Sequence, residues 1–417
     1  MQNFITKIEG HGKLKINWEK NVVQLEIDEG ERLFEGMLEG RTAEETYWIT
    51  PRICGVCPVA HNLSSVKAVE NALRVTPSDN AVLLRRLMLA GQMIQSHVLH
   101  LFFLALPDYL GIDRGTELAS KKPELFKTAF LFKELSDEIV QTVAGRSVHP
   151  TTTAIGGFHK IPSLKELENL KVKISQTSEQ AEKIAKFCAD LKYPEMKTDL
   201  EFVALHDGKN YSVYDALTVI SSKKGKFEIK DYKENITETI KELSTAKFGS
   251  LKSREIMSGS LARTFINGEF MTARAKKMLG YLDFKNPFYN NFAQAIEILH
   301  FIDEADEILE KLIQTKNLDD AIVSELRFPN SEIGVPKIGI GNVEAPRGGL
   351  YHEFHIGEDG IITEANIITP TVQNLTSIEK SANALLEQTK NLSQEKRQKL
   401  LEMLVRAYDP CITCAVH

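Results

Sequence analysis

Cysteine is scarce in this sequence, and basic residues are not in excess. Five cysteines among 417 residues are far too few for a disulfide scaffold. The net charge of −6 provides no basic field for counterion release from a nucleic-acid backbone, so we expect no nucleic acid among the partners. With 42% hydrophobic and 26% charged residues, the composition is that of a globular protein, which excludes a disordered or fibrous chain.

Export and membrane signals are also lacking. The first ten residues contain no basic region followed by an apolar stretch, so no secretory signal is expected. The strongest candidate for a membrane segment, 21 uncharged residues from Leu87 to Pro107, contains five polar side chains, including Gln95 and His97. A lipid-facing helix would have to bury these groups without water. We therefore expect a helix buried in protein and no direct membrane span.

Apolar periodicity predicts a mostly helical chain with a central, densely apolar helix over about residues 78–106. Ser163 and Glu166 form a capping-box signature before one of the other long helices, which are expected over 123–143, 164–191, 287–312 and 393–407. Small sheets are predicted by two strands over 14–18 and 22–27 and by a hairpin within 351–362. No repeat or clear linker divides the chain, so we predict a single domain over residues 1–417.

Four of the five cysteines form two C-x-x-C pairs, Cys54 with Cys57 and Cys411 with Cys414. Four thiolates at this spacing predict a tetrathiolate metal site. The pairs lie 354 residues apart, whereas the pairs of a zinc ribbon are usually about 15 to 20 residues apart. A structural zinc site and two separate redox dithiols remain as alternatives.

The blocks around these pairs resemble a known family. R-I-C-G-V-C followed by His61, and D-P-C-I-T-C followed by His417, are similar to the two signature motifs of the large subunit of nickel-iron hydrogenases. Further blocks match at residues 7–11, 34–36, 145–150 and 344–348, so the resemblance covers essentially the whole chain. It implies a mainly α (α+β) fold, with a central bundle of long helices and small peripheral β-sheets. It also implies an enzyme that reversibly cleaves dihydrogen into protons and electrons.

Two positions depart from the family pattern. Lys7 stands where the family usually has arginine, and Gln95-Ser96-His97 stands where the periplasmic uptake enzymes tend to carry H-D-H. The stretch from Met93 to Asp108 looks more like the cytoplasmic multimeric hydrogenases coupled to NAD(P), deazaflavin or heterodisulfide partners. The resemblance therefore implies a cytoplasmic enzyme.

The resemblance also assigns roles to the cysteines. Cys54 and Cys411 correspond to terminal nickel ligands, and Cys57 and Cys414 correspond to ligands that bridge nickel to an iron carrying carbon monoxide and cyanide. Thiolates are soft donors that suit a redox-active nickel. A metal centre of this kind is therefore the expected cofactor.

Heterolytic cleavage of dihydrogen, a very weak acid, needs a metal to accept hydride and a nearby base to accept the proton. The resemblance offers either Cys411 or Arg347 as that base, and Glu9 as the group that relays the proton away. A carboxyl near a thiolate and away from bulk water should have a raised pKa, which suits a proton shuttle.

The remaining site assignments come from the same resemblance. Glu35, the backbone carbonyl of Ile367 and His417 correspond to an outer site for Mg²⁺ or Fe²⁺, and an oxygen-rich site with one imidazole suits such a cation. His61 resembles the histidine that hydrogen-bonds a bridging sulfur. By the same resemblance, Asp409 and Arg347 orient the site. Pro370 and Thr371 stand where the family lines the pocket of the cyanide ligands.

Counting cysteines implies a partner. Only Cys188 lies outside the two pairs, and it is expected to be a small buried core residue. An iron–sulfur cluster normally needs four ligands, so we expect an iron–sulfur partner subunit, with further electron-acceptor subunits that use flavin or NAD(P). Family precursors often lose a C-terminal extension after the last histidine, so an end at His417 matches either a processed chain or a gene that lacks the extension.

Two non-enzymatic alternatives remain. One is a zinc-stabilised scaffold. The other is a non-catalytic subunit similar to the quinone-pocket subunit of respiratory complex I, although that relative lacks the four cysteines.

Overall fold

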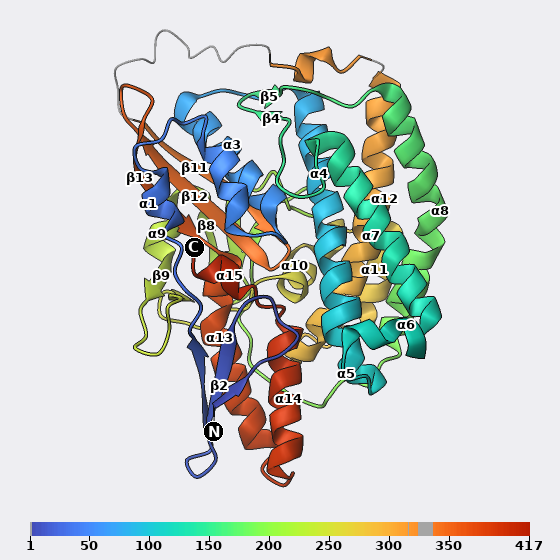
Figure 1. Cartoon of the computed structure of the whole chain (residues 1–417), viewed down its shortest axis with the longest axis vertical. Helices are drawn as coiled ribbons and strands as arrows, with labels where there is room; N and C mark the ends of the chain where they lie inside the picture. Colours follow the sequence, from blue (N-terminus) through green and yellow to red (C-terminus); the bar gives the residue numbers. More distant parts are fainter. Residues whose placement is uncertain (1, 316, 324–336) are drawn as a thin grey trace.

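The computed structural model describes residues 2–315, 317–323 and 337–417. Helices dominate, and the long ones run roughly along the long axis of the molecule (Figure 1). The long helices are α3 (Pro58–Leu73), α4 (Asp79–Val98), α7 (Pro123–Ala144), α8 (Leu164–Ala189), α12 (Asn290–Thr315), α13 (Pro370–Gln388) and α14 (Gln394–Ala407). The shorter ones are α1 (Phe34–Leu38), α2 (Thr46–Ile49), α5 (Leu106–Leu110), α6 (Leu118–Lys121), α9 (Tyr232–Asn235), α10 (Ser260–Asn267), α11 (Ala273–Met278) and α15 (Ile412–Ala415).

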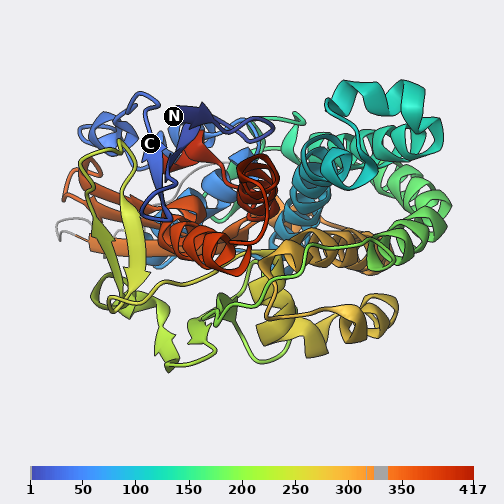
Figure 2. The same cartoon turned by 90° about the horizontal axis from the view of Figure 1, so that it is seen from below.

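Four long helices form the central bundle. Helix α4 packs against α7 and α12, and α12 also packs against α8, as Figures 1 and 2 show on one half of the molecule. The helices predicted over 123–143, 164–191 and 393–407 are confirmed as α7, α8 and α14, and the capping box of Ser163 and Glu166 is present. The helix predicted from residue 287 begins at Asn290 instead, because a 3-10 turn, η7 (Pro287–Tyr289), precedes it.

The central helix changes its geometry near its end. Helix α4 continues into α5 through a π-helical stretch, η2 (Leu99–Ala105), which contains His100. Hydrogen bonds to Gln294 and to the Arg406 carbonyl hold the His100 ring. Within the described residues, Asp79–Leu110 is the one helix that is long and apolar enough to cross a membrane, but 83% of its apolar window is buried in the protein. The prediction of a helix buried in protein is therefore confirmed.

Small antiparallel sheets lie beside the bundle, most of them on the other half of the molecule (Figures 1 and 2). The N-terminal sheet has the order β1-β2-β3, which confirms both predicted strands, and the predicted hairpin is formed by β12 and β13 in the sheet β11-β12-β13. The other sheets have the orders β4-β5, β6-β7-β8 and β10-β9. The strands are β1 (Gln2–Phe4), β2 (Gly12–Asn17), β3 (Val22–Ile27), β4 (Thr153–Ala154), β5 (Gly157–Phe158), β6 (Val203–His206), β7 (Thr218–Ser221), β8 (Gly225–Glu228), β9 (Ile236–Thr239), β10 (Phe248–Leu251), β11 (Lys337–Ala345), β12 (Gly348–Ile356) and β13 (Ile362–Ile368).

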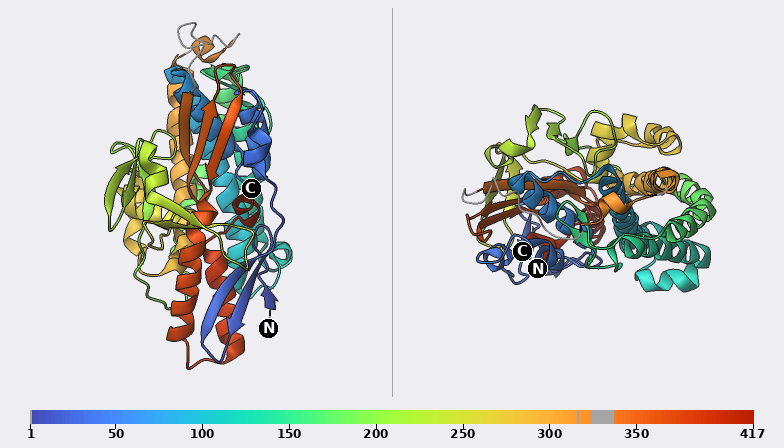
Figure 3. Two further views of the ribbon diagram at one scale, coloured as in Figure 1. Left: turned by 90° about the vertical axis from the view of Figure 1, so that its left-hand side faces the viewer. Right: turned by 90° about the horizontal axis from the view of Figure 1, so that it is seen from above.

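The sheet β11-β12-β13 is covered on both faces. Helix α3 packs against β11 and β12, and β6 contacts the same two strands from the region of the smaller sheets (Figure 3). A Cβ atom at Gly341 would lie only 1.9 Å from the Ser64 carbonyl oxygen, so a glycine is required for α3 to approach β11 this closely. Because α3 is buried on almost every side, it lacks the polar face by which periodicity identifies a helix.

Two hydrophobic cores meet where the ends of the chain come together. One core fills the space among the bundle, α3 and the sheet β11-β12-β13, and the other lies among the N-terminal sheet, α13 and α14. The four paired cysteines belong to the first core. Ile412, which lies between Cys411 and Cys414, and Ala415, which follows Cys414, belong to the second. The C-terminal cysteine loop therefore lies at the boundary between the two cores.

Candidate metal centre

Backbone contacts join the N-terminal segment to the C-terminal cysteine loop. Glu9 and Cys411 form a parallel bridge, in which the Ile412 amide donates to the Glu9 carbonyl at 2.9 Å. Gly10 has φ +84°, and a Cβ atom there would lie 2.8 Å from both Ile412 Cβ and Thr413 N. Only glycine satisfies the dihedral and the space together. The segment around Glu9 is thereby fixed against Cys411.

The two cysteine pairs lie on loops that lead into helices. Cys54 follows the 3-10 turn η1 (Thr50–Ile53), and Cys57 directly precedes α3, whose first residue is Pro58. Cys411 precedes α15, and Cys414 lies within it. All four cysteine side chains are buried. Arg32 joins the loops by donating to the carbonyls of Ile53 and Thr413.

The four thiols are free and close together. The Sγ atoms of Cys54 and Cys411 are 3.3 Å apart, and those of Cys57 and Cys414 are 3.8 Å apart. The Sγ atoms of Cys54, Cys411 and Cys414 all lie within 4.8 Å of one another. Two thiolates bound to one ion at about 2.3 Å are about 3.3 to 3.8 Å apart when the bond angle is about 90° to 109°. The donor set therefore fits a thiolate-bound metal centre.

The two thiols nearest Glu9 differ in acidity. The hydrogen bond from Cys411, followed by those from the other two thiols, lowers the pKa of Cys54 well below its ordinary value. Burial raises the pKa of Cys411 well above its ordinary value. Cys54 therefore contributes negative charge next to the Glu9 carboxyl.

Glu9 lies beside Cys411. Its Oε2 is 2.8 Å from Cys411 Sγ and accepts a hydrogen bond from Thr413 N at 3.2 Å. Burial, and then the negative charge of Cys54, raise the pKa of the Glu9 carboxyl. A carboxyl that holds its proton more tightly than usual, in contact with a thiol, has the chemistry of a proton relay.

Arg347 and Asp409 form a buried ion pair near the cysteines. Arg347 donates from Nη2 to Asp409 Oδ1 at 2.8 Å and from Nε to the Asp409 carbonyl at 2.6 Å, and its Nη1 is 3.4 Å from Ser96 Oγ. Burial opposes the charge of Arg347, but Asp409 and then Cys411 raise the Arg347 pKa above its ordinary value. Asp409 has φ +52°, a strained conformation for a non-glycine residue, directly before Pro410. The positive charge is thus held at a fixed position beside Cys411.

His61 and Thr371 contact the cysteines from two helices. His61 Nε2, on α3, is 3.1 Å from Cys414 Sγ. Thr371 Oγ1, in the first turn of α13, accepts a hydrogen bond from Cys411 N at 3.0 Å, and Pro370 begins that helix. Burial lowers the pKa of His61 to about 3. Its ring is therefore neutral.

Glu35, Ile367 and His417 also lie together. Glu35 Oε1 accepts from Ile367 N at 2.7 Å, and His417 Nε2 is 2.8 Å from the Ile367 carbonyl oxygen and 3.9 Å from Glu35 Oε1. His417 Nδ1 is 2.9 Å from the Cys414 carbonyl oxygen. Both ring nitrogens thus face carbonyl oxygens, although a neutral imidazole has one proton to donate. A cation beside Nε2 would satisfy this arrangement, so these donors fit the outer metal site that the resemblance implies.

A buried ion network behind Arg347 was not predicted. Arg263, on α10, donates to Glu297 at 2.6 and 2.8 Å, to Glu344 at 2.9 Å, and to the carbonyls of Ala345 and Pro346. All three charged side chains are fully buried. Because those carbonyls belong to the two residues before Arg347, the network fixes the strand end that carries Arg347. Glu344 lies in the block 344–348 that resembles the hydrogenase family, but Arg263 lies 81 residues before it and in none of those blocks. No motif therefore pointed to Arg263.

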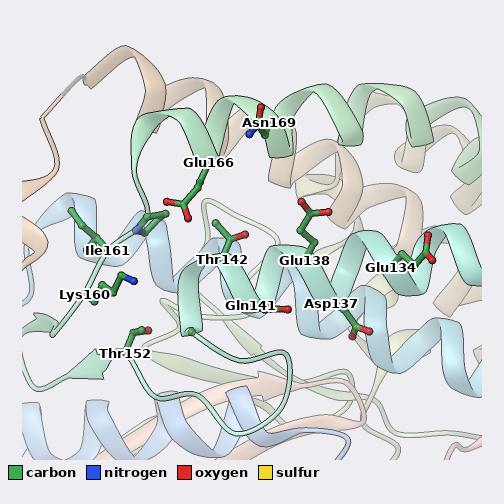
Figure 4. Close-up of a pocket in the computed structure, with 12 residues that line it drawn as sticks. Glu134, Asp137, Glu138, Gln141, Thr142, Thr152, Lys160, Ile161, Glu166 and Asn169 are labelled. Carbon is green, nitrogen blue, oxygen red and sulfur yellow. The ribbon is translucent and has the colours of Figure 1, made fainter.

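A groove elsewhere on the molecule is acidic. It has a volume of about 650 Å³, lies between α7 and α8, and is lined by Glu134, Asp137, Glu138 and Glu166 (Figure 4). Lys133 pairs with Asp137 and Lys173 with Glu138, while Glu166 caps α8. Three of these four carboxylates, those of Asp137, Glu138 and Glu166, are therefore already engaged, and none of the predicted site residues lines the groove.

The chain is similar to hydrogenases along its whole length. The family model for nickel-dependent hydrogenases matches residues 32–141 and 268–417. Sulfhydrogenase 1 subunit alpha of Pyrococcus furiosus is 33% identical over 99% of this chain and 96% of that protein. The NAD-reducing hydrogenase HoxS subunit beta of Cupriavidus necator is 28% identical over 99% of this chain and 93% of that protein.

Solved structures show the same fold. The crystal structure of an NAD⁺-reducing NiFe hydrogenase matches with a TM-score of 0.87 and 26% identity, covering 100% of this chain and 98% of that one. The NiFeSe hydrogenase of Desulfovibrio vulgaris Hildenborough matches with a TM-score of 0.78 and 22% identity, covering 100% and 99%. The predicted fold class, a helix bundle with small peripheral sheets, is therefore confirmed.

These findings favour the enzyme over both non-enzymatic alternatives. The family model covers more than half of the chain, and the fold brings all four cysteines of the two motifs together. The chain therefore belongs to the nickel-dependent hydrogenase family, as the catalytic large subunit of a nickel-iron hydrogenase.

Proposed function

We propose that the four cysteines would hold the metal centre that cleaves dihydrogen. Cys54 and Cys411 would serve as terminal ligands of nickel, and Cys57 and Cys414 would serve as ligands shared by nickel and an iron that carries carbon monoxide and cyanide. Bound there, the metals would supply the acceptor for the electron pair of the H–H bond. The 2.8 Å contact between Cys411 Sγ and Glu9 Oε2 carries this proposal, because it gives the proton an acceptor and a way out.

Cys411 is the base in this proposal, and Glu9 is the relay. A charged guanidinium has no lone pair with which to take a proton, and Asp409 favours the charged form of Arg347. Arg347 and Asp409 therefore orient the site and hold positive charge beside Cys411. The proton passes from Cys411 Sγ to Glu9 Oε2, whose raised pKa favours its capture.

The residues around the iron complete the proposed centre. His61 supports the bridging sulfur of Cys414, with which it is in contact. Pro370 and Thr371 line the pocket of the cyanide ligands, a role supported by the position of Thr371 against Cys411 N.

We propose a Mg²⁺ or Fe²⁺ ion at the outer site, held by Glu35, the Ile367 carbonyl and His417. A carboxylate, a carbonyl and an imidazole suit a hard cation. A cavity of about 220 Å³, lined in part by Glu35, Lys247 and His417, adjoins this site, and water in it would fill the remaining coordination positions. The ion would tie the C-terminal segment to α1 and β13.

Electrons leave, in this proposal, through an iron–sulfur subunit of a hetero-oligomer. Cys188 is buried in α8, so no fifth thiol is available for a cluster. Gly55, between Cys54 and Cys57, is exposed. Arg52 and Arg146, which are both exposed, flank this position. Arg146 lies here because His149 contacts the Pro51 carbonyl and so holds the loop of residues 145–150 next to the first cysteine pair. The partner subunit would dock on this surface, within reach of the metal ligands.

Further subunits that use flavin or NAD(P) would receive the electrons, as the name of the NAD-reducing relative suggests for that protein. The location is proposed to be cytoplasmic on the strength of the Gln95-Ser96-His97 block. A single domain over residues 1–417 is proposed because both ends of the chain contribute to one site.

Metal analysis and infrared spectroscopy test the proposal. Purified protein should contain nickel and iron in similar amounts and show infrared bands of carbon monoxide and cyanide, and Cys57→Ser should lose both nickel and activity. Cys188→Ser, a change of a buried thiol outside the site, is the matched control and should keep its nickel. Zinc alone, or a fully loaded sample without the infrared bands, would refute the proposed centre.

A further inference from the structure

A chain of hydrogen bonds runs from the metal site into the protein core. It starts at Cys414 Sγ, 3.1 Å from His61 Nε2. His61 Nδ1 is 3.1 Å from His352 Nε2, and His352 Nδ1 is 2.9 Å from Ser65 Oγ. Ser65 Oγ is in turn 2.7 Å from Thr50 Oγ1. The four residues beyond the cysteine are fully buried, and they come from α3, β12 and the turn η1.

The chain has one consistent direction when Cys414 is a thiolate. A thiolate only accepts, so His61 Nε2 must carry the proton, and Nδ1 of the neutral ring must accept. His352 Nε2 then donates to His61, and His352 Nδ1 accepts from the Ser65 hydroxyl. Ser65 Oγ is left to accept from Thr50, whose hydroxyl lies nearer to Ser65 than to the His61 carbonyl oxygen at 3.2 Å.

We propose that His352, Ser65 and Thr50 are positioning residues that fix the tautomer of His61, so that its Nε2–H always points at the Cys414 sulfur. The inference rests on the proposed role of Cys414 as a metal-bound thiolate. Without an ordered donor at His61 Nδ1, the ring can take the other tautomer and turn a lone pair toward the sulfur, which removes the bond and replaces it with repulsion.

The fixed tautomer of His61 affects the electron density on one of the two proposed bridging sulfurs, that of Cys414. An N–H donor withdraws electron density from a thiolate, and hydrogen bonds to sulfur ligands set the reduction potentials of metal centres. Within the described residues, Cys57 Sγ shows a hydrogen-bond contact with Cys414 and none with a ring or backbone N–H. The chain therefore makes the two bridging sulfurs unequal, with Cys414 the poorer electron donor.

Four variants test this inference. His352→Leu removes both ring nitrogens, whereas His352→Gln keeps a donor for His61 and an acceptor for Ser65. Ser65→Ala breaks the chain one bond farther from the metal. Ser136→Ala is the matched control, because Ser136 is also a fully buried helix serine but bonds the Lys133 carbonyl in α7. For each protein we would measure bound nickel, hydrogen oxidation per nickel, and the midpoint potential of the nickel electron paramagnetic resonance signal.

The four variants should differ in the size of their effect on the midpoint potential. His352→Leu should lower the midpoint potential and reduce activity per nickel about 10- to 100-fold, as loss of a partner around a metal ligand typically does. Ser65→Ala should shift the potential in the same direction by less, and His352→Gln and Ser136→Ala should match the parent protein.

Three results would overturn the inference. One is a parental potential in both His352→Leu and Ser65→Ala. Another is a shift in His352→Gln equal to that in His352→Leu. The third is a shift of that size in the control Ser136→Ala. If His352→Leu binds no nickel, Ser65→Ala decides the question. A parent protein without nickel would instead refute the metal centre itself.

Discussion

Replacing Glu9 by glutamine tests the proton route most directly. Glutamine has the same shape as glutamate, and its side-chain oxygen can still accept the hydrogen bond from Thr413 N. The bond between the Ile412 amide and the Glu9 carbonyl belongs to the backbone and is unaffected. The junction between the chain ends should therefore persist, and only the ability to take up a proton should be lost.

The size of the effect follows from the position of the carboxyl. Glu9 Oε2 lies 2.8 Å from Cys411 Sγ, within direct proton-transfer distance. Removing a positioned acid or base typically costs about 10²- to 10⁴-fold in rate, which corresponds to about 3 to 5 kcal/mol in activation free energy. We expect a loss of this size for Glu9→Gln. Glu9→Asp keeps the acid but withdraws it by one methylene, so it should fall between the parent and Glu9→Gln.

The assay is hydrogen oxidation with an artificial electron acceptor, normalised to bound nickel. Normalisation separates proton transfer from metal loss, because a purely structural role would reduce nickel content and leave the rate per nickel unchanged. A rate per nickel for Glu9→Gln within about twofold of the parent would refute the relay, since that is far below the loss expected of a catalytic acid or base.

Two stability predictions concern ionisable residues away from the cysteines, the fully buried Arg263 and the partly buried Glu304. Arg263→Met should lower the free energy of unfolding by about 3 to 5 kcal/mol, because it leaves two buried carboxylates uncompensated; denaturant unfolding measures this, and a change below 1 kcal/mol would contradict it. Burial raises the pKa of Glu304 to about 7, so the folded state binds a proton that the unfolded state releases above about pH 4.3. Stability should therefore decline as the pH rises from about 4 to 8. Glu304→Gln should remove that decline, gaining up to about 3 kcal/mol at pH 8 and nothing at pH 4. Equal pH dependence in the two proteins would show that Glu304 titrates normally.

Much of the fold could be predicted because its helices have two unlike faces or recognisable ends. Helix α8 shows both, with a polar face and the capping box of Ser163 and Glu166. Helix α3 shows neither, since it is buried on almost every side and packs against a strand through Gly341. Local sequence cannot reveal such a helix, because what stabilises it comes from residues distant in the chain.

The cysteine site was predictable because thiol chemistry and C-x-x-C spacing coincide, whereas Glu9 and His61 were assigned through the resemblance to the family. The structure places all six residues in one cluster of contacts. Arg263 and His352 act through other residues and lie far in sequence from what they touch. A lone arginine or histidine carries no spacing signal, so only the fold could reveal that these two support Arg347 and His61.

The separation of the cysteine pairs also constrains how the protein is made. The ribosome delivers Cys54 and Cys57 long before Cys411, and 354 residues at about 5 to 20 residues per second correspond to a delay of roughly 20 to 70 s. During that interval the first cysteine pair exists without the second, so the proposed four-cysteine centre cannot form. Its closure needs residues 409–417 to settle between Glu9 and Glu35, so the segment that carries the second pair is the one that seals the proposed centre. In this proposal, all four cysteines can hold metal only after residue 414 has been synthesised and has docked.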